Sequence, residues 1–392
     1  MTLSHAEYQA IANQLTPNGQ AFIDGKFCDA LDGEKFETTN PATGQVLASV
    51  AHCKAADVDR AVIAARRVFN AGTWSRAEPE ERKEVLLKVA ELVRKHTHEL
   101  AVLESMDTGK TINDCMDEIG GEVPNFFQWY AELADKTFGK IAPTGPGALA
   151  LIIKEPAGIA GAVLPWNFPL VMAAWKIAPA LAVGCSAVIK PAEQTSLSAI
   201  RLAELMQEAG VPDGVINIVP GFGETAGKAI GLHNDIDTVS FTGSTEVGRM
   251  FMRYSGDSNL KGVGLEMGGK SPFIVLDDAL ITDDLIEHAA MSAFWNGGQN
   301  CTANMRQLIA APLVEEFTGR ILERVKAFKL GDPLDPATDI GSMITKDHKT
   351  MVMNYIQSGV DEGANMLVGG ASDLPGYFIE PTVFQNVTPD MK

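Results

Sequence analysis

The sequence contains little cysteine and no long hydrophobic run, and both shortages exclude classes of protein. The five cysteines among 392 residues are Cys28, Cys53, Cys115, Cys185 and Cys301. They form no CxxC pair and show no metal-ligand spacing, so the pattern argues against a disulfide framework or a metal site and favours reduced thiols in the cytoplasm. No stretch reaches the 18 or more apolar residues of a membrane helix, because even residues 169–184 are interrupted by Lys176 and Pro179.

Positive charge is also scarce. Lys and Arg total 32 against 50 Asp and Glu, which gives a formal net charge of −18. This balance opposes a sequence-independent grip on nucleic acid or on an anionic membrane. The N-terminus, MTLSHAEYQA, lacks the basic start and apolar run of a secretory signal. With 46% hydrophobic and 21% charged residues, the chain is predicted to be globular, acidic and cytoplasmic.

Strand and helix patterns alternate in the middle of the chain. Short apolar runs stand at 159–164, 186–190, 215–219 and 237–241, and helices are predicted to start at Pro169, Ser196, Glu224 and Thr245. Strands alternating with helices at this pitch predict right-handed crossovers and a doubly wound parallel sheet. Such α/β sheets bind ligands beyond the carboxyl ends of their strands.

The flanking regions predict further elements. Apolar periodicity indicates helices from Ala56, from Pro79 and over residues 111–136, the last interrupted at Pro124. Residues 148–154, ALALIIK, read as a strand in a projecting arm. A second α/β block is expected from Gly262, beginning with the strand GVGLE, and a crevice is expected between the two blocks.

Three loops after predicted strands could hold a dinucleotide. Gly221-Phe-Gly223 is followed by a third glycine one residue too late for GxGxxG, so a simple glycine-rich turn is an alternative. Gly243-Ser244 precedes a helix whose N-terminus would favour a pyrophosphate, or else forms an ordinary capped turn. Lys190 and Glu193 could contact ribose hydroxyls, or form an exposed surface pair.

Three further segments offer reactive chemistry. Cys301 lies in the glycine-rich stretch WNGGQNC, where a thiolate would be a nucleophile and a buried inert thiol is the alternative. Glu266, in LEMGGKSP, suits a general base in a dry crevice, or is a surface carboxylate. Asn167, in PWNFP, could hold an oxyanion, or stabilise a turn.

An acidic series follows in the third helical segment. Asp114, Glu118 and Glu122 are spaced four apart, which places them on one face of an α-helix. That face is either solvated or, at Glu122, close to a substrate entrance where it would meet a cationic amino group.

Taken together, the segments resemble the aldehyde dehydrogenase superfamily over essentially the whole chain. The resemblance depends on PWNFP with Asn167, KPAEQT with Lys190 and Glu193, FTGSTEVG with Gly243 and Ser244, LEMGGKSP with Glu266, and GQNC with Cys301. Each motif is weak alone, whereas all five in this order are specific. The chain looks most like the hydrolytic NAD-dependent branch that includes γ-glutamyl-γ-aminobutyraldehyde and other aminoaldehyde enzymes.

The resemblance implies a mechanism. Cys301 would attack the aldehyde, Asn167 and the Cys301 backbone N–H would hold the oxyanion, and Glu266 would activate water against a thioester. The cofactor would be NAD, because Glu193 would repel the 2′-phosphate of NADP. The residues implied to contact the cofactor are Trp166, Lys190, Glu193, Gly223, Gly243 and Ser244. Those implied to line the tunnel for an aliphatic or ω-amino aldehyde are Phe168, Met172, Trp175 and Trp295.

The same resemblance implies an NAD-binding domain at 1–138 and 158–264, an oligomerisation arm at 139–157 and a catalytic domain at 265–392. The complete protein would be a homodimer or homotetramer. Met305 and Ser342-Met343 depart from the family pattern. The sequence ends before the family's Glu-Glu-x-Phe-Gly-Pro segment, so the catalytic domain is expected to be incomplete. Two rival functions are a CoA-acylating aldehyde dehydrogenase, which Glu266 argues against, and a dinucleotide-binding fragment without turnover.

Overall fold

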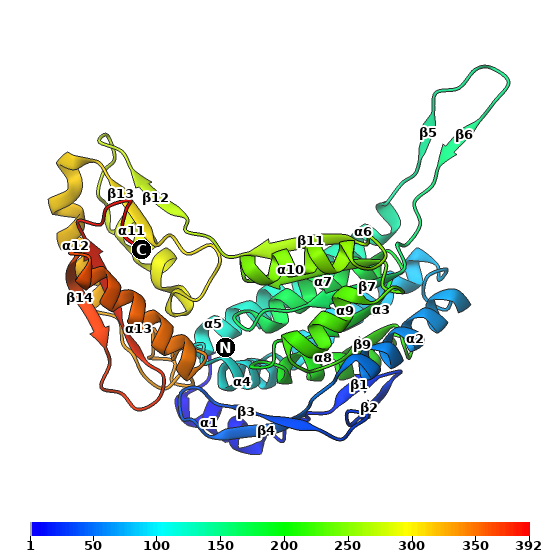
Figure 1. The fold of residues 1–392 in the computed structure, drawn as a ribbon, viewed down its shortest axis with the longest axis horizontal. Coiled ribbons are helices and arrows are strands. Elements are labelled where there is room, and N and C mark those ends of the chain that lie inside the picture. Colours follow the sequence, from blue (N-terminus) through cyan, green and yellow to red (C-terminus); the bar gives the residue numbers. More distant parts are fainter. Residues whose placement is uncertain (1) are drawn as a thin grey trace.

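A seven-stranded sheet lies at the centre of the computed structural model, which describes residues 2–392 (Figure 1). Its strands run in the order β11-β10-β7-β8-β9-β1-β2. Their bounds are β1 Ala21–Ile23, β2 Lys26–Cys28, β7 Ile159–Val163, β8 Ser186–Lys190, β9 Ile216–Ile218, β10 Thr238–Gly243 and β11 Gly262–Met267. The strands from β7 to β11 are parallel to one another, and β1 and β2 add an antiparallel edge.

Helices cover both faces of this sheet, as predicted for a doubly wound fold. On β8, Ala187 and Ile189 pack into one hydrophobic cluster and Val188 packs into the other. This alternation follows from the two-residue period of a strand, and it explains why SAVIK is apolar almost throughout. The crossover helices are α7 Pro169–Ala182, α8 Leu197–Ala209, α9 Lys228–Leu232, preceded by a π-helical turn at Gly223–Gly227, and α10 Thr245–Gly256.

The N-terminal part supplies further helices and a hairpin. The helices are α1 His5–Gln14, α2 Ala55–Ala71, α3 Pro79–Lys95, α4 Thr97–Thr108, α5 Ile112–Asp117 and α6 Val123–Leu133, and the hairpin is β3 Lys35–Thr39 with β4 Val46–Ala51. A π-helical turn, Glu118–Glu122, separates α5 from α6, and a 3₁₀ turn follows at Ala134–Lys136. Pro124 lies in the first turn of α6, directly after this π-helical turn. Glu122 and Val123 keep α-helical backbone angles, so the helix changes its turn here and is not broken as predicted.

The second lobe, residues 268–392, contains two small sheets and three helices. Strands β12 Pro272–Val275 and β13 Arg306–Ile309 are parallel, and β14 Asn365–Ala371 and β15 Ile379–Gln385 are antiparallel. The helices are α11 Asp283–Phe294, α12 Val314–Lys326 and α13 Lys346–Asp361, with 3₁₀ turns at Trp295–Gly298 and Ala311–Leu313.

The strand GVGLE belongs to the central sheet and not, as was predicted, to the second lobe. GVGLE does not begin the second block, because β11 pairs with β10 from Gly262 to Met267 as the edge of the seven-stranded sheet. The expected boundary between residues 264 and 265 therefore falls inside a strand. The apolar alternation of GVGLE gives no information about which sheet it joins.

The arm projects away from the body of the molecule (Figure 1). It is a hairpin of β5 Lys140–Ala142 and β6 Ala150–Ile152, rather than the single strand predicted at 148–154. Ile141 and Leu151 face each other across it and both are largely exposed, at 72% and 61%.

Candidate functional site

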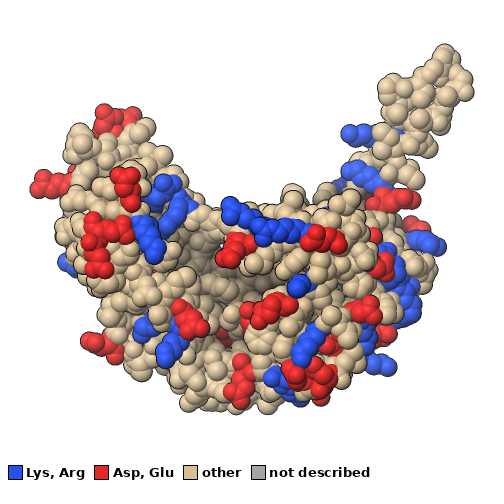
Figure 2. Space-filling view, viewed as in Figure 1, with Lys and Arg blue, Asp and Glu red and all other residues tan. Residues whose placement is uncertain are grey.

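The predicted motifs lie at the carboxyl ends of the parallel strands of the central sheet. After β7 the chain passes to β8 and β9 on one side, and later returns to β10 on the other side of β7. This reversal of strand order creates the crevice in which doubly wound folds bind ligands. Figure 1 shows the arrow of β11 pointing toward the second lobe, and Figure 2 shows the surface hollowed between that lobe and the body of the molecule.

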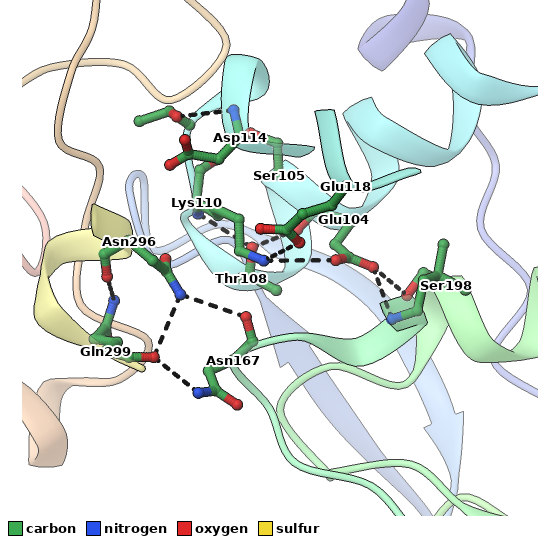
Figure 3. A network of polar contacts seen from close by, with 12 residues as sticks. Glu104, Ser105, Thr108, Lys110, Asp114, Glu118, Asn167, Ser198, Asn296 and Gln299 are labelled. Carbon is green, nitrogen blue, oxygen red and sulfur yellow. Dashed lines mark hydrogen bonds and ion pairs between the residues drawn. The ribbon is translucent and has the colours of Figure 1, made fainter. Parts of the chain in front are cut away.

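Asn167 and the cysteine loop, residues 295–302, are joined directly. Asn167 Nδ2 donates to the carbonyl oxygen of Gln299 at 2.8 Å, and Asn296 Nδ2 lies 3.4 Å from the carbonyl oxygen of Asn167 (Figure 3). The loop turns through three successive left-handed residues, Asn296, Gly297 and Gly298. The structure therefore brings the predicted oxyanion amide within two residues of Cys301.

Cys301 is exposed, so the alternative of a buried inert thiol is wrong for this residue. That alternative describes Cys53 and Cys115, which are buried, and burial raises the pKa of both thiols. The half-buried Cys28 also has a raised pKa, because burial outweighs the opposing effect of Arg60.

Glu266 lies on β11 beside Thr242 of β10. It is exposed, so the expectation of a carboxylate in a dry crevice is wrong: β11 is the edge strand of the sheet, and alternate residues face solvent. Its strand leads to the cysteine loop, because a Cβ placed on Gly269 would lie 3.9 Å from the carbonyl oxygen of Cys301. Burial lowers the pKa of Lys176 on α7 to about 8, and the charge of Glu266 acts in the opposite direction.

Lys190 and Glu193 form a pair at the end of β8. Lys190 is only 2% exposed, and its Nζ donates to the carbonyl oxygen of Pro191 at 2.6 Å and to Glu193 Oε2 at 3.1 Å. Burial lowers the pKa of the amine, while Glu193 raises it. The alternative of an exposed surface pair is therefore wrong for Lys190, whose side chain packs against the π-helical turn: a Cβ on Gly227 would lie 3.5 Å from Lys190 Cδ.

The loops after β9 and β10 have features that fit a dinucleotide. A Cβ on Gly223 would meet nothing within 4 Å, so this turn is open, and Thr242 Oγ1 is buried without a hydrogen-bond partner. A Cβ on Gly243 would lie 2.6 Å from the Phe241 ring, so only glycine fits there without movement of that ring. Ser244 Oγ accepts from the backbone N–H of Val247 and caps α10, whose positive end favours an anion.

The four residues predicted to line a tunnel do not form one cluster. Phe168 and Trp295 pack together with ring centroids 5.1 Å apart, which joins the two lobes beside Asn167. Trp175 instead packs on Phe126 at 5.4 Å and is half exposed, and Met172 lies against the main core. Trp166 packs edge-on against His348 of α13 at 5.1 Å.

A buried charged cluster lies behind Phe168, and sequence reasoning missed most of it. Lys110 Nζ lies 2.5 Å from Glu118 Oε2, 3.8 Å from Glu104 Oε1 and 4.1 Å from the centroid of the Phe168 ring (Figure 3). Glu104 Oε2 accepts from the backbone N–H of Leu170, in the first turn of α7. No local pattern marks these residues, because their burial results from the packing of α4, α5 and α7.

The acidic face predicted for Asp114, Glu118 and Glu122 is broken. Glu118 is 2% exposed and Asp114 is half-buried, whereas Glu122 is exposed. The π-helical turn at Glu118–Glu122 has a wider turn than an α-helix, so a spacing of four no longer keeps side chains on one face. A solvated acidic face is therefore wrong for Glu118.

The described part of the chain offers neither a metal site nor a membrane-spanning helix. Among residues 2–392, no group of three or more His, Cys, Asp or Glu side chains could hold a metal ion. No helix of these residues is long and apolar enough to cross a membrane.

Known proteins are similar to this chain in both sequence and fold. The pattern of the aldehyde dehydrogenase family matches residues 27–392. An aminoacetaldehyde dehydrogenase of Pseudomonas aeruginosa is 48% identical over 387 residues, which cover 99% of this chain and 78% of that protein. The NADP/NAD-dependent aldehyde dehydrogenase PuuC of Escherichia coli is 43% identical over 392 residues, which cover 100% and 79%.

A solved structure gives the same result for the fold. The NAD⁺ complex of an indole-3-acetaldehyde dehydrogenase superimposes with a TM-score of 0.97 at 42% identity, covering 100% of this chain and 79% of that one. The fold, the motif order and these relatives agree. The chain belongs to the aldehyde dehydrogenase family and is an NAD-dependent aldehyde dehydrogenase.

Proposed function

We propose that Cys301 is the nucleophile, Asn167 the oxyanion donor and Glu266 the general base of this enzyme. The observation that supports this most strongly is the 2.8 Å hydrogen bond from Asn167 to Gln299, because it joins the end of β7 to the cysteine loop of the other lobe. The exposure of Cys301 also supports its role as the nucleophile, because a nucleophile must reach its substrate.

Each group has a chemical task in this proposal. The Cys301 sulfur adds to the aldehyde carbon, and the oxygen that becomes negative is held by Asn167 and the Cys301 backbone N–H. One such donor is commonly worth about 3–4 kcal/mol in the transition state. NAD, when bound, supplies the hydride acceptor of the reaction. Glu266 then removes a proton from the water that attacks the Cys301 thioester, which releases a carboxylic acid.

The test is a pre-steady-state measurement of NADH with propanal as substrate. The wild-type chain should give a burst of NADH that Cys301→Ala abolishes, and Glu266→Gln should keep the burst but slow later turnovers by roughly 10²–10⁴-fold. A burst that survives in Cys301→Ala would reject the nucleophile. Turnover that requires CoA would instead indicate an acyl-transferring enzyme, and the absence of any turnover would indicate a dinucleotide-binding fragment.

We also propose that the cofactor contacts are Trp166, Lys190, Glu193, Gly223, Gly243 and Ser244. The position of Glu193 at the end of β8, beside the switch point, supports NAD over NADP, because a carboxylate repels a 2′-phosphate. Glu193→Gln should lower kcat/KM with NAD and raise the NADP-to-NAD ratio by about tenfold, the effect of one charge contact of roughly 1.4 kcal/mol. Comparable kcat/KM for both cofactors in the wild-type chain would contradict this assignment.

For the substrate we propose an aliphatic or ω-amino aldehyde that reaches Cys301 past the paired rings of Phe168 and Trp295. The relative named for aminoacetaldehyde and the packing of Phe168 on Trp295 support this. Met172 and Trp175 lie apart from this pair, and their part in the tunnel stays a prediction. An exposed carboxylate at Glu122 is available to a cationic substrate. Glu122→Gln should weaken aminoaldehydes selectively, whereas equal effects on propanal would reject a role for Glu122.

The organisation proposed for this protein is an NAD-binding domain, an arm and a catalytic domain. With β11 assigned to the large sheet, the NAD-binding domain comprises 1–138 and 158–267, the arm 139–157 and the catalytic domain 268–392. The exposed apolar pair of the arm supports a homodimer or homotetramer. A cytoplasmic setting suits a thiol nucleophile among unpaired cysteines.

A further inference from the structure

We propose that the side chain of Gln299 is a positioning residue that fixes the cysteine loop in its reactive geometry. This inference depends on the proposed role of Cys301. Gln299 is 9% exposed, and its amide has three partners: Oε1 accepts from the backbone N–H of Ile344 at 3.1 Å, and Nε2 donates to the carbonyl oxygens of Asn296 at 3.1 Å and Ser342 at 3.4 Å. A buried amide with these partners holds its backbone in one place.

The loop needs such a restraint because its backbone is unfavourable on its own. Asn296 has φ of 51° and is followed by two glycines that are also left-handed, at 62° and 75°. A non-glycine residue in this region is uncommon and costs free energy. The bond from Gln299 Nε2 to Asn296 O spans the turn, so the side chain stabilises a conformation that the backbone does not favour.

Gln299 also connects the loop to both lobes. Its carbonyl oxygen accepts from Asn167, and Ser342, which accepts from its side chain, donates its backbone N–H to the carbonyl oxygen of Gly109 at 3.1 Å. Figure 3 shows the side-chain amides of Asn167, Asn296 and Gln299, each directed at a backbone carbonyl oxygen of another of these three residues. The position of Cys301 relative to Asn167 is therefore set through one residue that contacts neither the aldehyde nor the cofactor in the proposed mechanism.

Loss of this restraint has a predictable effect. A displacement of about 1 Å in a reacting group can slow a reaction by roughly 100-fold, because the attack geometry is lost while binding is kept. Gln299→Met keeps the length of the side chain and removes all three hydrogen bonds. Gln299→Glu keeps the shape and the bond from Ile344, but places a carboxylate oxygen against two carbonyl oxygens.

The experiment compares four measurements in the 392-residue chain: the rate constant of the NADH burst with propanal, the rate of Cys301 alkylation by iodoacetamide, the NADH dissociation constant and the melting temperature. We expect Gln299→Met to slow the burst by roughly 100-fold and Gln299→Glu by roughly 10-fold. Alkylation and NADH binding should each change less than about threefold, since small reagents do not need the aligned geometry. Gln307→Met is the matched control, because Gln307 on β13 donates one bond to Ala289 at 3.1 Å, and its burst should remain unchanged.

Two results would overturn the inference. A burst within about threefold of wild type in Gln299→Met would show that the loop holds its geometry without the amide. A parallel fall of burst, alkylation, NADH binding and melting temperature would show that Gln299 only stabilises the fold. Cys301→Ala separates failure of this inference from failure of the proposed function. An NADH burst that survives in Cys301→Ala rejects Cys301 as the nucleophile. A burst that is lost in Cys301→Ala but intact in Gln299→Met rejects only the positioning role of Gln299.

Discussion

At the scale of single residues, the charged cluster behind Phe168 shows how burial changes chemistry. Burial raises the pKa of Glu118 to about 8, although Lys110 acts to lower it, and burial also raises the pKa of Glu104. Burial disfavours the charged form of Lys110 as well, but the two carboxylates raise its pKa, so it stays protonated. At neutral pH the raised pKa of Glu118 leaves this carboxyl mostly neutral beside the protonated Lys110.

This charge state predicts unequal costs of substitution. Glu118→Gln should cost less than about 1.5 kcal/mol of unfolding free energy at pH 7, because it replaces a group that is already mostly neutral. Lys110→Met should cost about 3–5 kcal/mol, since it leaves buried carboxyls without their cation. Urea denaturation of both variants measures the difference, and equal costs would mean that Glu118 is ionised.

Asp107 provides a pH-dependent prediction. It is 1% exposed and accepts from the Thr38 hydroxyl and the Leu197 backbone N–H, and burial raises its pKa to about 7 despite these bonds. An unfolded Asp has a pKa of about 3.9, so between about pH 4 and 7 the native state binds more protons than the unfolded state. The Asp107 contribution to the free energy of unfolding should thus fall across that range and stay constant above it.

The test variant is Asp107→Asn, which resembles the protonated acid in shape and hydrogen bonding. The free energy of unfolding of this variant minus that of wild type should increase by roughly 2 kcal/mol from pH 5 to pH 8, because only wild type loses stability as Asp107 ionises. Denaturation at four pH values gives this difference. A relative stability that does not change with pH would contradict the raised pKa.

At the scale of elements, the periodic segments of the middle region were predictable and the short or irregular ones were not. Strands β7, β8 and β10 and helices α7 and α10 occur as predicted, because buried strands between helices have a strong local pattern. Strands β1 and β2 have three residues each and lack such a pattern, and β14, β15 and α13 were also missed. The spacing of residues in the sequence does not predict the π-helical turn that follows α5.

The arm is the element whose composition makes the clearest prediction. The hairpin of β5 and β6 exposes apolar side chains and, beyond its base, shows little charge in Figure 2. Replacing Ile141 and Leu151 together by Ser should reduce the assembly to monomers, because exposed apolar pairs stabilise only when another surface covers them. Light scattering measures the mass and circular dichroism checks the fold. Lys140→Gln, on the same strand, is the control and should leave the mass unchanged, and a wild-type chain that is already monomeric would reject the idea.

At the scale of the whole molecule, the two lobes meet at a very close backbone crossing. A Cβ on Gly341 would lie 1.9 Å from the carbonyl oxygen of Gly109, and the same segment leads to Ser342 and Ile344, which bind Gln299. The contact therefore connects the junction of the lobes to the cysteine loop.

This crossing predicts that Gly341→Ala lowers the free energy of unfolding by about 1–3 kcal/mol and slows the NADH burst, since backbone must move to admit the methyl group. Gly319→Ala is the matched control: Gly319 is exposed in α12 with nothing near its Cβ, so alanine should add about 0.5–1 kcal/mol of stability. Denaturation and burst measurements on both variants test this, and a neutral Gly341→Ala would contradict the crossing.

The sequence by itself determined the doubly wound sheet and the identity of the reactive groups, because strand period, helix period and side-chain chemistry are local properties. Only the tertiary structure decided which groups are buried or exposed and which meet. Lys190 and Glu118 are buried and Glu266 is exposed, opposite to what loop position or spacing suggested. Asn167 and Gln299 are 132 residues apart, and only the packing of one lobe on the other brings an amide of the first within 2.8 Å of a carbonyl oxygen of the second.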